Sequence, residues 1–183
     1  PIIIFNASTR ITGLSQNAAF SLLTAWALRL TGQPVVHFVC SRGMSACVLG
    51  TNREDVWREP PCKRCVEQSR RLFNSGDIEY FENKVDPQVR TTLEGLNIQQ
   101  LTTFVHKGMH LGELVLPSIR WVLRRHHLFD DHNTKFLYRQ FILSAWSVAC
   151  RFEEVITRLN PTGVLVFNGM FFPEAIVRTV AIK

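Results

Sequence analysis

Apolar residues near the amino terminus form two short runs, separated by a stretch with a helical period. Residues 1–6 and 35–40 are rich in Ile, Val and Phe, which is typical of buried parallel strands. Between them, apolar residues recur at steps of three and four over 14–30, and Thr31-Gly32 provides a stop. This order predicts a strand, an amphipathic helix and a second parallel strand, joined as a right-handed βαβ unit.

The middle of the chain predicts mostly helices. A short helix is expected over 66–73, whereas residues 77–90 are acidic and show no regular period. Residues 108–113 contain two glycines and are expected to form a loop that enters a helix over 114–123. The longest helical period covers 136–159, and we expect its Cys150 to pack as a small apolar side chain.

The end of the chain returns to the pattern of the beginning. Residues 164–167 predict a strand, Asn168-Gly169 a sharp exit from it, and 173–180 a helix that Pro173 opens. The chain therefore predicts an α/β fold, a Rossmann-like parallel sheet flanked by helices, with a helix-rich middle and a cysteine-rich loop. Residues 1–183 suit a single domain.

Polar residues follow the first and the last predicted strands. The candidates for substrate binding are Asn6, Ser8 and Arg10 after the first strand, and Asn168 and Gly169 after the last. Because the carboxyl ends of parallel strands meet at one edge, where open α/β sheets bind ligands, we expect Asn6, Arg10 and Asn168 to line one cleft. The rim should include 108–113. Turn formation and simple solvent exposure are the alternative roles for these residues.

The first turn carries no glycine-rich phosphate motif. Neither Gly-x-Gly-x-x-Gly nor Gly-x-x-x-x-Gly-Lys occurs between the first predicted strand and helix. Both motifs place backbone N–H groups around phosphates. Their absence makes this turn a poor candidate for binding a dinucleotide or a nucleoside triphosphate.

Four of the five cysteines, Cys40, Cys47, Cys62 and Cys65, gather in a loop over 40–66. The Cys62-Lys63-Arg64-Cys65 turn places two thiolates on one side of a cation, and the earlier pair would complete a tetrahedral sulfur site. Zinc is the favoured occupant, and an iron–sulfur cluster is less favoured. The Cys-x6-Cys-x14-Cys-x2-Cys spacing is not that of a standard zinc ribbon. Redox-active, disulfide-linked or free cysteines therefore stay open as alternatives.

The formal net charge is +6, and much of the excess lies over 120–139. Such a segment suits nucleic acid, anionic lipid headgroups or a phosphorylated substrate, but also a plain solvated helix face. No RNP, helix-turn-helix or zinc-finger pattern supports a nucleic-acid reader. No apolar run approaches the roughly 20 residues of a membrane span. With no signal peptide, the clustered cysteines favour the cytoplasm.

In combination, these elements resemble the amino-terminal half of bacterial capsule and surface-polysaccharide biosynthesis glycosyltransferases, which are similar to two-Rossmann, GT-B-type enzymes. The residues that carry the resemblance are 1–6, the four cysteines with Pro61, Gly108-x-x-Leu111-Gly112, and 164–169 with Glu174. It implies a transferase whose saccharide or lipid-linked acceptor binds this half. A nucleotide-sugar donor would bind mainly a following carboxy-terminal half. Family members often have a basic residue after the Asn-Gly, where this chain has Met170.

The chain begins at Pro1 and stops within a predicted helix, which indicates a piece of a larger protein. Residues 1–183 alone are then expected to transfer no sugar. We expect a cytoplasmic location, with peripheral contact at the inner face of the membrane as a further option. The alternative function is a non-enzymatic, metal-stabilised interaction module with a basic helical face. A second Rossmann half in the full reading frame would favour the enzyme.

Sugar transfer by direct displacement at the anomeric carbon needs a general base for the acceptor hydroxyl and stabilisation of the leaving diphosphate. His110 and Glu113, at a predicted helix entry, are the candidate catalytic residues. An exposed histidine and an ordinary helix-start charge are the alternative interpretation of the same pair. Arg10 is a candidate for binding an anionic group of the acceptor or donor by charge-assisted hydrogen bonds.

Overall fold

The computed structural model describes residues 1–9, 11–74 and 76–183. Four strands form one parallel sheet in the order β3-β2-β1-β4. The strands are β1 (Ile2–Asn6), β2 (Val35–Cys40), β3 (Asp77–Phe81) and β4 (Gly163–Leu165). The amino-terminal end of β1 sits between its neighbours, with Ile2 opposite both Val35 and Gly163. The predicted α/β, Rossmann-like arrangement is confirmed.

Helices flank this sheet and continue beyond it. They are α1 (Gln16–Leu30), α2 (Cys62–Leu72), α3 (Pro87–Glu94), α4 (Ile98–Thr102), α5 (Leu111–Leu123), α6 (His132–Leu159) and α7 (Phe172–Ile182). Side-chain caps fix several of their starts. Ser15 Oγ accepts a hydrogen bond from the Ala18 N–H at 3.0 Å, and an Asp131 carboxylate oxygen accepts one from the Thr134 N–H at 2.8 Å.

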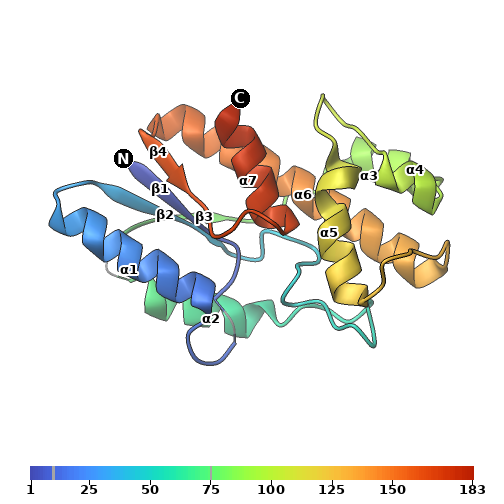
Figure 1. Cartoon of the computed structure of the whole chain (residues 1–183), viewed down its shortest axis with the longest axis horizontal. Coiled ribbons are helices and arrows are strands. Elements are labelled where there is room, and N and C mark those ends of the chain that lie inside the picture. The colour runs from blue at the N-terminus through green and yellow to red at the C-terminus, as the bar shows by residue number, and fades with distance from the viewer. Residues whose placement is uncertain (10, 75) are drawn as a thin grey trace.

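The sheet is the middle of three layers, with α1 and α2 on one face and α6 and α7 on the other (Figure 1). The alternation of side chains along β1 explains why both faces are apolar. Ile3 and Phe5 join the large core cluster that includes Phe152 of α6, whereas Ile4 packs with Ala25 of α1. All three β1 side chains are buried.

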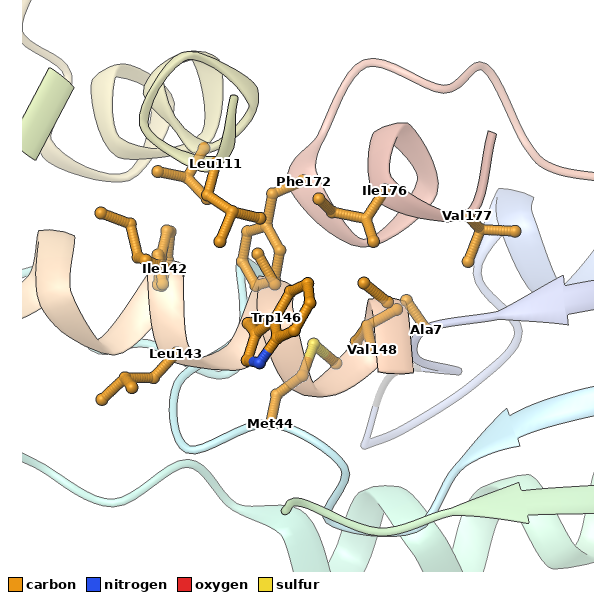
Figure 2. Close-up of a cluster of buried hydrophobic side chains, with 14 of the residues drawn as sticks. Ala7, Met44, Leu111, Ile142, Leu143, Trp146, Val148, Phe172, Ile176 and Val177 are labelled. Atoms are coloured by element: carbon orange, nitrogen blue, oxygen red, sulfur yellow. The ribbon is translucent and has the colours of Figure 1, made fainter. Parts of the chain in front are cut away.

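Helices α5, α6 and α7 extend the core past the carboxyl edge of the sheet. Figure 2 shows Leu111 of α5, Ile142 of α6 and Phe172 of α7 converging on one cluster. Met44, from the segment after β2, enters the same cluster beside Trp146. The cysteine-rich segment is therefore anchored to the helical core rather than loosely attached to the surface.

The structure differs from the sequence prediction in the middle of the chain. The acidic stretch 77–90, expected to be irregular, contains β3 and the start of α3. β3 is an edge strand, and most of its residues are exposed or half-buried, so it needs no apolar run. Three helices also begin at least three residues earlier than expected, α2 at Cys62, α5 at Leu111 and α6 at His132.

Across the described residues, each helix is too short or too polar to reach from one side of a membrane to the other. The longest, α6, carries charged side chains along its length.

Candidate functional site

Two adjoining cavities lie at the carboxyl edge of the sheet. The first, of about 290 Å³, is lined by Cys40, Cys47, Cys62 and Cys65, and is called the cysteine cavity below. The second, of about 190 Å³, is lined by Glu174 among others, and is called the Glu174 cavity. Five residues line both cavities and so form a shared wall: Ala7, Ser8, Met44, Cys47 and Leu49.

Three segments bring the four cysteines to one cavity. Cys40 ends β2, Cys47 follows in the next loop, and Cys62 and Cys65 occupy the first turn of α2. The Gly43 N–H donates to Cys40 Sγ, and the Gly50 N–H donates to Cys47 Sγ, each at 3.2 Å. Both pairs are Cys-x-x-Gly sequences with the same backbone-to-sulfur contact. All five cysteines of the chain are free rather than disulfide-bonded.

Burial strongly affects the ionisation of these thiols. It raises the pKa of Cys47 to about 12, and the neighbouring thiols Cys62 and Cys65 add to this rise. Burial also raises the pKa of Cys40 and Cys62. The raised pKa values keep the thiols of Cys40, Cys47 and Cys62 protonated at neutral pH, which disfavours a nucleophilic or redox-active thiolate at these three residues. A bound metal would supply positive charge and displace the protons.

The separation of the thiols matters for what they can bind. Within the described ranges, no three Cys, His, Asp or Glu side chains are close enough together to hold one metal ion. The four thiols nevertheless line a single cavity. They therefore stand around a volume rather than converging on a point.

The Glu174 cavity holds a buried carboxyl group. Glu174 lies in the first turn of α7, is only 7% exposed, and its Oε1 accepts a hydrogen bond from Asn17 Nδ2 at 3.3 Å. Burial raises the pKa of Glu174 to about 7, although the backbone and Asn17 hydrogen bonds act in the opposite direction. Such a group exchanges a proton readily at neutral pH, which is what a general base or acid requires.

Ser8 and Asn168 reach this edge as the sequence predicts. Ser8 lines both cavities, and Asn168 lines the Glu174 cavity. Ser8 and Asn168 reach the same edge because β1 and β4 are parallel neighbours, with Ile4 opposite Leu165. Asn168 also shapes its own turn, since its φ is 50° and its Oδ1 accepts a hydrogen bond from the Met170 N–H at 3.0 Å.

The other residues predicted to bind substrate do not line either cavity in the part of the chain that the structure describes. Gly169, with φ of 68°, supplies the left-handed conformation of the turn. Asn6 is fully buried, and its Nδ2 lies 3.4 Å from His37 Nδ1, so it belongs to the interior of the sheet. Arg10 lies outside the described residues.

The predicted catalytic pair is at the start of α5. His110 Nδ1 lies 3.6 Å from a Glu113 carboxylate oxygen, and the two side chains are 61% and 63% exposed. Neither lines the cysteine cavity or the Glu174 cavity. The arrangement suits a solvent-exposed polar contact at a helix start.

Local contacts occupy much of the basic segment 120–139. Arg125 pairs with Asp131 at 3.7 Å and Lys135 with Asp130 at 3.2 Å. Arg139 donates to the Leu96 carbonyl oxygen at 3.2 Å. These contacts favour the interpretation of the segment as a solvated helix surface with structural ion pairs over that of a nucleic-acid interface.

Neither Glu174 nor the two Cys-x-x-Gly turns were expected from the sequence to take part in chemistry. Glu174 shows no local signal, because its partner Asn17 lies 157 residues away along the chain. The repeated Cys-x-x-Gly spacing at Cys40 and Cys47 is visible in the sequence and indicates two matched turns with N–H groups directed at sulfur.

Comparison with known proteins does not place the chain in a family. No protein-family model matches it, and no curated protein matches it.

Proposed function

We propose that this chain is the acceptor-binding half of a glycosyltransferase, with Glu174 as the general base. The observation that carries the proposal is a buried carboxyl with a pKa of about 7 in a cavity at the carboxyl edge of a parallel sheet. The resemblance to capsule and surface-polysaccharide glycosyltransferases supports the same activity. A following half of the protein would bind the nucleotide-sugar donor.

The chemistry assigns tasks to four polar residues of the Glu174 cavity. Ionised Glu174 accepts a hydrogen bond from the attacking hydroxyl of the acceptor and takes its proton as that oxygen bonds to the anomeric carbon. The bond from the anomeric carbon to the diphosphate oxygen breaks, and the nucleoside diphosphate leaves with its electron pair. Asn17 fixes the orientation of the carboxylate, while Ser8 and Asn168 are placed to hold other acceptor hydroxyls.

A cytoplasmic enzyme fits the reduced state of the cysteines. Contact with the inner face of the membrane would suit a lipid-linked acceptor.

The test uses the full-length protein with a panel of labelled nucleotide sugars and saccharide or lipid-linked acceptors. We expect acceptor-dependent transfer by the full-length protein and none by residues 1–183, because the donor-binding half and the interdomain cleft are then missing. Turnover by residues 1–183 alone, or a full reading frame without a second nucleotide-binding half, would contradict the proposal.

One observation favours a second candidate, a non-enzymatic module stabilised by a metal. Four thiols line one cavity, and metal binding in such sites is coupled to folding. If the protein is a non-enzymatic module, it needs no general base, and replacing Glu174 should change none of its functions. If the protein is a transferase, replacing Glu174 should abolish turnover but leave any bound metal in place.

A further inference from the structure

We infer that the cysteine cavity binds a [4Fe–4S] cluster rather than a zinc ion. The inference concerns the four thiols alone and does not depend on the proposed transferase activity. Cys40, Cys47, Cys62 and Cys65 come from three segments and line one cavity of about 290 Å³. Four cysteine ligands are the usual complement of such a cluster.

The spacing of the thiols distinguishes the two occupants. Around zinc, four sulfurs lie about 2.3 Å from one ion, and therefore only about 3.8 Å from each other. Here the thiols share a cavity, yet among the described residues no three of the metal-ligating type converge on one ion. A cubane cluster carries four separate iron atoms and takes one thiolate at each. Its ligands therefore stand around a larger volume, as these do.

Backbone N–H groups and the start of a helix stabilise negative charge on the sulfur atoms of the cysteines. Cys40 Sγ and Cys47 Sγ each accept an N–H hydrogen bond at 3.2 Å, from Gly43 and Gly50. Hydrogen bonds to the ligand sulfurs are one of the factors that set the potential of a cluster. Cys62 and Cys65 lie in the first turn of the 11-residue helix α2, whose positive end favours thiolates.

Glycine is required at both turns for steric reasons. A Cβ atom at Gly43 would meet the Phe81 side chain. At Gly50, a Cβ atom would lie 2.8 Å from Pro60 Cβ and 2.9 Å from Cys47 Sγ. The Cys40–Gly43 turn thus packs tightly against Phe81, and the Cys47–Gly50 turn packs tightly against Pro60 and its own sulfur atom.

The remaining walls of the cavity are mostly apolar, and Leu49 among them is 53% exposed. Ile11, Leu49 and Val66 present apolar side chains, and Met44 connects the wall to the helical core. Arg42 also lines the cavity and offsets the negative charge that four thiolates bring. Solvent exposure is one of the factors that set the potential of a cluster, and this cavity is partly open to solvent.

Loading can proceed by ligand exchange. An incoming [4Fe–4S] cluster carries four exchangeable thiolate ligands, and each leaves as a free thiol after taking the proton of one protein cysteine. Four new iron–sulfur bonds to the protein replace the four that break. The oxidation state of the cluster does not change, so no oxidant or reductant is needed.

The test is metal and sulfide analysis of the full-length protein purified without oxygen and then incubated with a thiolate-ligated [4Fe–4S] cluster. We expect about four iron and four acid-labile sulfide per chain, with broad visible absorption. Cys62→Ser and Cys47→Ala should each reduce the iron content to well below half. Cys150→Ser is the matched control, because Cys150 lies in α6 away from the cavity, and it should retain full iron content.

Two results would overturn the inference. One is a single zinc per chain with no labile sulfide. The other is wild-type protein that stays metal-free, with its thiols reactive, after incubation with the cluster donor. Should the cysteine variants fail to fold, the stoichiometry of the wild-type protein decides by itself.

Discussion

The two cavities at the carboxyl edge share a wall but differ in chemistry and in origin. The cysteine cavity is lined mainly by thiols and apolar side chains, whereas the Glu174 cavity presents a carboxyl together with several amides and hydroxyls. All four thiols of the first come from residues 40–65. The second joins Asn17 to Glu174, 157 residues apart. A local cluster of unusual residues can be found in a sequence, but a site built by sheet topology cannot.

The shared wall connects both cavities to the same core. Met44 lines each of them and packs with Trp146 of α6 (Figure 2). Ser144 Oγ of α6 also lies 3.1 Å from Ser45 Oγ and accepts a hydrogen bond from the Ala46 N–H at 3.3 Å. A helix of 28 residues therefore holds the segment that separates the two cavities. Because both cavities are supported by the same helix, the effects of substitutions in one cavity can be compared with the effects of substitutions in the other.

The larger expected effect on stability is on the Glu174 side. Burial raises the pKa of Glu174 from 4.5 to about 7, so the folded protein keeps a proton that the unfolded chain loses between these pH values. Wild-type stability should therefore fall by up to about 3 kcal/mol as the pH rises through this window. Glu174→Gln removes the charge, so its advantage over wild type should be largest at pH 8. Urea unfolding at pH 5 and pH 8 measures the difference.

Two features make this comparison specific. Burial lowers the pKa of His37 to about 4, which destabilises the protein as the pH falls below 6.5, but this effect is present in both proteins and cancels. Glu113→Gln is the matched control, because Glu113 is exposed at the start of α5. Equal pH dependence in wild type and Glu174→Gln would show that Glu174 is not buried as described.

A smaller effect is expected on the cysteine side. Gly50→Ala would place a methyl group 2.8 Å from Pro60 Cβ and 2.9 Å from Cys47 Sγ, and the resulting shift should cost about 1–3 kcal/mol. Gly95→Ala is the control, since Gly95 has no neighbour within 4 Å of the added atom and a φ of −86°. Thermal unfolding of both variants measures the difference. Equal stability of the two would refute tight packing at the Cys47–Gly50 turn.

Much of the fold was predictable because its strong signals are local. The Ile and Phe run of β1 and the period of α6 depend on residues that are neighbours in the sequence. β3 was missed because an edge strand with half-exposed side chains has no apolar run to recognise. The loops after β1 and β4 were expected to share an edge because the strands of one parallel sheet point the same way, but the direct pairing of β1 with β4 was not predicted.

The candidate site was less predictable. The sequence indicated that the four cysteines act together, and it placed Ser8 and Asn168 at one edge. It favoured His110 and Glu113 as catalytic residues because they precede a helix, but helix starts attract such residues for electrostatic reasons alone. The burial of Glu174 depends on long-range packing of α7 against α5 and α6, which no short pattern encodes.

The most direct test of the central claim compares Glu174→Gln with Glu113→Gln in the full-length protein. Loss of the general base should lower the rate of sugar transfer by about 10²–10⁴-fold, whereas loss of an exposed carboxylate at the start of α5 should leave it nearly unchanged. The wild-type rate should also rise with pH through about 7, as Glu174 ionises. Undiminished transfer by Glu174→Gln, or a comparable loss in Glu113→Gln, would contradict the assignment of Glu174 as the base.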